Sequence, residues 1–248
     1  MPGIEVMNCR HCGSALNYKA QFCNHCGKQL KGEIIDYSDK NKKYFVRTIV
    51  LYTVLVLILG INHVVIQHYN SFLSEIAINI LLFCTVTTFI VIDPKPFFAL
   101  LVTRFRFRPF LQIFGFILVL FPIVHYSVHF INTSLFKIDY RYVDSYFNTS
   151  HPVFYAFLFV SLIPGVIEEF MFRGIMFNQL LFLTSPKFTI LITAITFSFA
   201  HFSFISLFWL FPFGLFLGYL RYRYRTILYG IFCHMLYNAI VVAVELSM

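Results

Sequence analysis

The sequence predicts an all-α protein, a polytopic membrane helical bundle of about seven spans that follows a small cysteine-rich domain. Three observations predict this fold class. Of the 248 residues, 59% are hydrophobic and 12% are charged, whereas a soluble domain has about 25% charged residues. The apolar residues form several long runs, and roughly 20 such residues suffice to cross a bilayer. Four of the six cysteines fall in two closely spaced pairs near the N-terminus.

Residues 1–30 hold these pairs in two short knuckles. They read Cys9-Arg10-His11-Cys12-Gly13 and Cys23-Asn24-His25-Cys26-Gly27. Two such units bring four thiolates within tetrahedral reach of one ion, and each glycine permits the tight turn that points backbone amides at sulfur. They resemble the short zinc ribbons of many bacterial membrane proteins. The expected ligands of a structural zinc ion are Cys9, Cys12, Cys23 and Cys26. The alternative, a pair of disulfides, would need an oxidising compartment.

A polar linker at residues 31–43 is expected to lead into a membrane domain at residues 44–248. We expect seven spans in it, at about residues 45–68, 76–92, 109–130, 153–183, 188–202, 206–220 and 226–244. The uncharged run of residues 188–220 is too long for one untilted span, so it is divided near residues 203–206. Gly214 and Gly218 have the spacing that lets two helices approach closely.

The positive charges are distributed unevenly along this pattern. If the N-terminus lies inside, 16 of the 19 Lys and Arg residues face the cytoplasm, as the positive-inside rule requires. We therefore expect a multi-pass protein of the cell (plasma) membrane with its zinc ribbon in the cytoplasm and its C-terminus outside. The charge of +8 is explained by membrane topology, so no nucleic acid partner is expected. No cleaved targeting segment is visible.

Two carboxylates and an arginine lie inside the fourth expected span. Ionisable residues in membrane spans are functional-site hypotheses by default. Glu169 and Arg173 are four residues apart on a helix and can form an ion pair, whereas Glu168 points about 100° away. Glu168 is therefore the carboxylate left free for chemistry. The alternative is that all three charges form one network that only fixes helix packing.

Two other expected spans also carry polar residues. His201 lies in the fifth, and His234 and Asn238 share one face of the seventh. Helix geometry permits all three to converge with Glu168, as a general base, a proton donor and a pair of hydrogen-bond donors for an oxyanion. Taken singly, His201 could bond a backbone carbonyl and Asn238 could join two helices.

Three short motifs that contain these polar residues follow one another along the chain. They are Glu168-Glu169-x-x-x-Arg173, Phe197-x-x-x-His201 and His234-x-x-x-Asn238. Their order and separation resemble the motifs of the CPBP family, which includes type II CAAX prenyl endopeptidases, bacteriocin-processing proteins and abortive-infection proteins. The resemblance covers about residues 110–245.

The resemblance implies an intramembrane endopeptidase. Glu168 would activate a water with help from His201, while His234 and Asn238 would stabilise the oxyanion. The ion pair of the first motif would hold this arrangement together. The implied substrate is a peptide bond in a hydrophobic, lipid-modified or membrane-associated peptide or protein, and membrane lipid is the expected surrounding partner.

Two alternatives stay open at this point. Two histidines and a glutamate resemble a catalytic zinc site, so a zinc-dependent membrane metalloprotease could use the same residues. No His-Glu-x-x-His motif is present, and Asn238 suits an oxyanion better than a zinc shell, which favours the metal-free mechanism. The second alternative is a non-catalytic bacteriocin-immunity or binding protein on the same fold. The sequence does not identify a partner of the ribbon.

Overall fold

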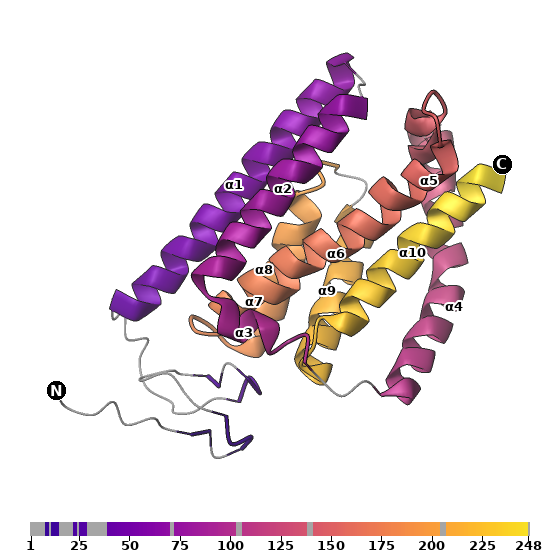
Figure 1. Cartoon of the computed structure of the whole chain (residues 1–248). Coiled ribbons are helices and arrows are strands. Elements are labelled where there is room, and N and C mark those ends of the chain that lie inside the picture. Colours follow the sequence, from indigo (N-terminus) through magenta and orange to yellow (C-terminus); the bar gives the residue numbers. More distant parts are fainter. Residues whose placement is uncertain are drawn as a thin grey trace.

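A computed structural model of the chain is shown in Figure 1. It describes residues 8–9, 11–14, 22–23, 25–28, 39–69, 72–102, 106–137, 141–203 and 207–247. The membrane domain in this part of the chain is built of helices, which confirms the all-α prediction. Residues 31–38 of the expected linker and residues 204–206 of the expected break between spans lie outside the described residues.

Two long helices form one side of the bundle. They are α1 (Asp39–Tyr69) and α2 (Phe72–Ile92), which lie side by side in Figure 1. Residues 39–43 of the expected linker are helical and continue into the apolar run of α1. A short helix, α3 (Pro94–Phe98), follows α2. Pro94 suits its first turn, where a backbone N–H would have no helical partner.

The centre of the bundle is one continuous helical segment in which the hydrogen-bond pattern changes four times. Its parts are α5 (Pro152–Ala156), the π-helix η3 (Phe157–Leu162), α6 (Ile163–Glu169), the π-helix η4 (Phe170–Met176) and α7 (Phe177–Leu180). Pro164 lies in the first turn of α6, where the π pattern of η3 gives way to the α pattern. Because π segments within helices are frequent at functional sites, the two that flank α6 single out the turn with the glutamates.

The remaining helices surround this segment. They are α4 (Phe107–Ile131), α8 (Pro186–Phe199), α9 (Leu207–Tyr224) and α10 (Leu228–Ser247), with the short η1 (Asn132–Phe136) and η2 (Tyr142–Tyr146) after α4. The helices α8 and α9 pack closely at the two predicted glycines. A Cβ atom added at Gly214 would lie 3.1 Å from Ala194 Cα, and one at Gly218 would lie 3.1 Å from Ile190 Cγ2. Only a small residue fits at such a contact.

Five helices of the described chain are long and apolar enough to cross a membrane. They correspond to the expected spans one to four and seven. The helix α8 has 14 residues, and α9 has 18 residues with two arginines in its last turn, so neither is among the five. The predicted count of seven spans is therefore not confirmed.

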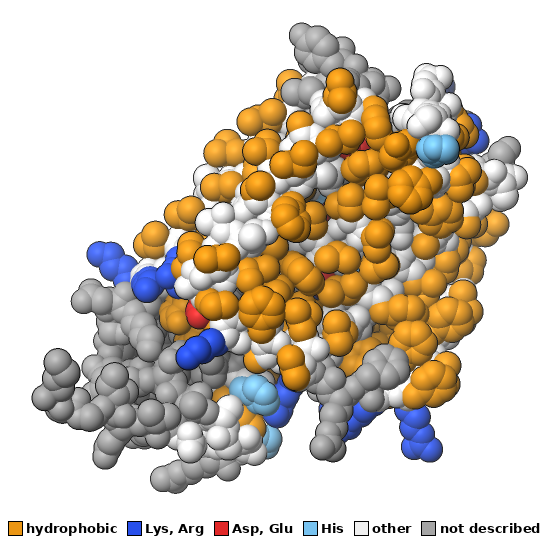
Figure 2. Space-filling model, viewed as in Figure 1, with side chains coloured by type: hydrophobic (Ala, Val, Ile, Leu, Met, Phe, Trp, Pro, Cys, Tyr) orange, Lys and Arg blue, Asp and Glu red, His pale blue; other side chains and the backbone are white. Residues whose placement is uncertain are grey.

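The two ends of the membrane domain differ in charge. In Figure 2, hydrophobic side chains cover the flank of the bundle, while most of the visible Lys and Arg side chains gather near its lower edge. The start of α1 and the end of α10 lie at opposite ends of the bundle (Figure 1). The molecule therefore has the length, composition and surface of a membrane protein.

Candidate functional site

Glu168 faces two histidines that come from other helices. Its Oε2 atom lies 3.9 Å from Nε2 of His201, just beyond the end of α8, and 3.9 Å from Nε2 of His234 on α10. This Oε2 atom is buried and has no hydrogen-bond partner within the described chain. The side chain of His201 is 32% exposed and that of His234 is 5% exposed. The fold thus brings together three predicted site residues around one unsatisfied carboxylate oxygen.

The orientation of His201 is fixed by the backbone of its own helix. Its Nδ1 atom lies 2.9 Å from the carbonyl oxygen of Phe197. A carbonyl oxygen only accepts, so Nδ1 carries a hydrogen and donates it. In the neutral ring Nε2 is then free to take a proton, and Nε2 is the atom that faces Glu168. The backbone bond considered for His201 in the sequence is present, and it leaves the other nitrogen available.

Glu169 and Arg173 form the predicted ion pair. Arg173 Nη1 donates to Glu169 Oε1 at 2.8 Å, and both side chains are 0% exposed. Arg173 Nη2 also donates to the carbonyl of Gly214, and its guanidinium lies 4.5 Å from the ring centre of Phe197. Glu169 Oε1 is 3.4 Å from Nδ1 of His234. A carboxylate therefore lies behind His234, opposite the nitrogen that faces Glu168.

Asn238 is tied to the backbone of a neighbouring helix. Its Nδ2 atom donates to the carbonyl oxygen of Val160 in η3 at 3.0 Å. Three residues earlier on α10, the carbonyl of Met235 accepts a hydrogen bond from Ser161 Oγ at 2.8 Å. These bonds join α10 to η3. Asn238 therefore makes the contact between two helices that was one of the two roles predicted for it. Its role at an oxyanion stays a prediction.

The distances between the catalytic candidates also show whether they are placed to bind one metal ion. Among the described residues, the ribbon cysteines are the one group of three or more His, Cys, Asp and Glu whose ligand atoms all lie within 4.8 Å of one another. Glu168, His201 and His234 do not form such a group. A single ion at this position would require the side chains to move closer together.

The match to a known family covers this part of the chain. Residues 150–240 match the family model described as type II CAAX prenyl endopeptidase Rce1-like. This segment is similar to the Rce1-like family. The match holds all six predicted site residues and confirms the resemblance to the CPBP family. It supports a CAAX-type membrane protease in general, and it starts after α4, whereas the core predicted from sequence began near residue 110. No curated protein and no solved structure matches the chain.

The Rce1-like segment contains a residue that sequence reasoning missed. A Cβ atom added at Gly230, in the first turn of α10, would lie 2.6 Å from Glu169 Oε2. Glycine in a helix costs about 1 kcal/mol relative to alanine, so an unexplained helical glycine is the signal that could have indicated a close contact. Gly230 lets α10 approach the buried carboxylate behind His234.

Gly230→Ala is therefore expected to lower the free energy of unfolding by about 1–3 kcal/mol, the usual range for overpacking. The carboxylate cannot move away easily, because it is fully buried and held by Arg173. The control is Gly115→Ala in α4, where an added Cβ would meet nothing within 4 Å. That change should be neutral or stabilising by up to about 1 kcal/mol. Unfolding of the two purified variants in the same detergent gives the comparison, and equal effects would contradict the proposed contact.

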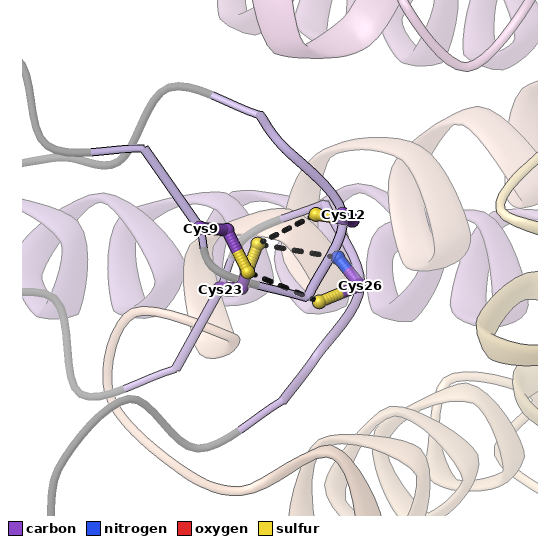
Figure 3. A group of neighbouring side chains, drawn as sticks. All are labelled: Cys9, Cys12, Cys23 and Cys26. Carbon is purple, nitrogen blue, oxygen red and sulfur yellow. Dashed lines mark hydrogen bonds between the residues drawn. The ribbon is translucent and has the colours of Figure 1, made fainter.

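The four ribbon cysteines lie together as predicted. Cys9 Sγ is 3.7 Å from Cys26 Sγ, and Cys12 Sγ is 3.5 Å from Cys23 Sγ (Figure 3). Four thiolates at about 2.3 Å from one tetrahedral zinc ion are roughly 3.8 Å apart, so the group has the right size. All of these cysteines are free. Burial raises the pKa of the Cys26 thiol to about 12, and coordination to a metal would remove its proton.

The two knuckles repeat the same backbone geometry. The Gly13 N–H donates to the carbonyl of Cys9, and the Gly27 N–H donates to the carbonyl of Cys23, each at 2.7 Å. Both glycines have positive φ angles, +72° and +70°, which explains why glycine ends each unit. The second turn points the Cys26 N–H at Cys23 Sγ at 3.4 Å. The residues present therefore fit a closed metal site.

Proposed function

We propose that this protein is an intramembrane endopeptidase that hydrolyses a peptide bond in a hydrophobic, lipid-modified or membrane-associated substrate. The observation that supports this most is the buried Oε2 atom of Glu168 between His201 and His234. Both separations of 3.9 Å exceed the ~2.6–3.2 Å of a direct catalytic hydrogen bond. They suit polar groups that share one water.

In the proposed reaction, Glu168 takes a proton from this water, and the water oxygen bonds to the carbonyl carbon of the substrate. His201 Nε2 accepts the second hydrogen bond of the water and orients it. His234 donates from Nε2 to the oxyanion of the tetrahedral intermediate, with Asn238 as the second donor. When the carbon–nitrogen bond breaks, Glu168 returns its proton to the leaving amine. Each residue thus acts where charge or a proton moves in the transition state.

The test of this function compares protein and peptide termini in membranes from cells that express the wild type or Glu168→Gln at equal abundance. Glutamine keeps the shape of the side chain and loses the base. Termini that appear only with the wild type would support the peptidase and identify its substrate. Identical termini in both membranes, with the biological phenotype retained by the variant, would favour a non-catalytic binding protein instead.

The orientation proposed for the membrane is supported by the basic end of the bundle. The three arginines at the end of α9 lie at the end where α1 begins, and most Lys and Arg side chains seen in Figure 2 gather there. By the positive-inside rule this end, with the ribbon, faces the cytoplasm of a cell whose plasma membrane holds the protein.

The metal of the ribbon is proposed to be structural zinc. Cys23→Ser is expected to lower the zinc content of the purified chain from about one ion to almost none, because three thiolates no longer close the tetrahedral site. The control is Cys84→Ser, which removes an exposed cysteine in α2 and should leave the zinc content unchanged. Metal analysis of both proteins checks this result. A full zinc content in Cys23→Ser would contradict the four-cysteine site.

A further inference from the structure

The second knuckle of the ribbon rests on the membrane domain. A Cβ atom added at Gly27 would lie 2.5 Å from Cε2 of Tyr222 in α9 and 2.8 Å from Cγ of Pro186 in α8. His25, in the same knuckle, lies beside Arg225, with 3.4 Å between His25 Nδ1 and Arg225 Nη1. The ribbon is therefore docked at the basic end of α9.

A cavity lies at this junction. Its volume is about 70 Å³, and its polar lining comes from His25, Asn178, Arg221 and Arg225. Apolar residues of α3 and the turn after it, together with Phe182 beyond α7, complete the wall, and no carboxylate is among the described lining residues. One water needs about 10–15 Å³ of such space. The cavity thus has room for several water-sized groups, such as the oxygens of one phosphate.

Arg221 is buried beside this cavity with only neutral partners. It is 3% exposed. Its Nε atom donates to the carbonyl of Arg173 at 3.1 Å, and its Nη2 atom donates to Oδ1 of Asn178 at 2.7 Å. No carboxylate of the described chain forms an ion pair with it, whereas Arg173 has Glu169. Because buried charges are normally paired with an opposite charge, Arg221 needs an anion that the described residues do not supply.

Arg225, which also lines the cavity, has an unusual backbone conformation. Its φ angle is +57°, and its N–H bonds the carbonyl of Arg221 at 3.0 Å to close the end of α9. Helices usually end with glycine in this left-handed conformation, because the Cβ atom of any other residue makes it unfavourable. Non-glycine residues held in this region cluster at functional sites. Here the strained residue is the one whose guanidinium meets the ribbon and lines the cavity.

We propose that this cavity binds one phosphate group between the ribbon and the membrane domain, with Arg221 and Arg225 supplying the charge. Guanidinium groups match phosphate oxygens in geometry and charge. The group can belong to the headgroup of an anionic phospholipid, since the site lies at the basic end of the bundle, or to a soluble phosphate. The proposal does not depend on the peptidase reaction. A bound phosphate would neutralise Arg221 and fasten the ribbon to α9.

The test uses the full zinc-loaded chain in dodecyl maltoside, a detergent without phosphate. Thermal unfolding is followed with increasing inorganic phosphate in one arm, and with mixed micelles of phosphatidylglycerol in the other, against an uncharged diacylglycerol. We expect an increase in the unfolding temperature that saturates. An increase in the lipid arm alone assigns the site to a headgroup, and an increase with inorganic phosphate assigns it to a soluble ligand. No increase in either arm overturns the proposal.

Two variants with the same loss of charge make the test specific. Arg225→Gln should raise the ligand concentration for half of the temperature increase by at least about tenfold, the equivalent of about 1.4 kcal/mol. Arg223→Gln should leave it unchanged, because Arg223 is exposed and does not line the cavity. An equal loss in both variants would show general surface attraction and would overturn the site.

A pair of glycine variants tests the part played by the ribbon. Gly27→Ala and Gly13→Ala place alanine at nearly the same positive φ angle, +70° and +72°, so the local strain is matched. Only Gly27→Ala meets Tyr222 and Pro186, whereas an added Cβ at Gly13 meets nothing within 4 Å. With zinc content verified in both, only Gly27→Ala should weaken the response to phosphate. If phosphate raises the unfolding temperature equally in the two variants, the ribbon does not form a wall of the site.

Discussion

Glu168→Gln is expected to lower the rate of peptide hydrolysis by about 10²–10⁴-fold, the usual contribution of a general base. Glutamine cannot take a proton from the attacking water, although it fills the same volume. The free energy of unfolding should change by less than about 1 kcal/mol, because the Glu168 side chain is partly exposed and its histidine neighbours lie at 3.9 Å, beyond direct hydrogen bonds. Turnover of a peptide taken from the Glu168-dependent termini, and unfolding of the same preparation, check both parts.

The matched control is Glu75→Gln, which changes another carboxylate inside a membrane helix. Glu75 accepts a hydrogen bond from the hydroxyl group of Tyr146, and a glutamine oxygen can still accept that bond. The rate of hydrolysis should therefore stay at the wild-type value. If Glu168→Gln keeps a rate within a few-fold of the wild type, Glu168 is not the base, and the water must be activated by another group.

Arg173→Met is expected to destabilise the membrane domain by about 3–5 kcal/mol, the cost of breaking a buried ion pair by removing one partner. Methionine fills much of the space of the arginine stem, but it leaves the carboxylate of Glu169 fully buried without a cation. The loss also removes the hydrogen bond to the carbonyl of Gly214. Unfolding of the variant in mixed detergent micelles measures the effect.

A double variant separates the charge from the packing. Glu169→Gln combined with Arg173→Met removes both charges, so it should recover a large part of the stability that Arg173→Met loses. Arg223→Met serves as the control for removing an exposed arginine and should change the stability by no more than about 0.5 kcal/mol. If the double variant is as unstable as the sum of its single variants, the two side chains are not coupled.

The parts of the structure that depend on local spacing could be predicted from the sequence. The Glu169–Arg173 pair follows from a separation of four residues on a helix, and the cysteine group follows from two repeated knuckles. The positions of the long helices follow from runs of apolar residues. The convergence of Glu168, His201 and His234 could be expected only by combining three motifs, since each motif alone has an ordinary structural explanation.

Other features depend on contacts between distant segments, and no local pattern signals them. Arg221 has the sequence position of a surface anchor at the end of a span, yet it is buried and reaches the carbonyl of Arg173. Asn238 lies on the expected face of α10, but its partner is Val160, 78 residues away. The π segments on both sides of α6 have no sequence period of their own. The number of membrane spans could not be predicted reliably either, because hydropathy alone does not decide how far α8 and α9 extend across a bilayer.

The shortness of α8 has a consequence for the lipid around it. With 14 residues and about 1.5 Å of rise per residue, α8 is about 21 Å long, about 9 Å less than the roughly 30 Å of the hydrocarbon layer. Such hydrophobic mismatch is met by thinning of the bilayer or by polar residues that flank the helix. His201 lies two residues beyond the C-terminal end of α8. A locally thin leaflet would let water reach Glu168 from the end of α8. The proposed hydrolysis inside a membrane needs such a supply of water.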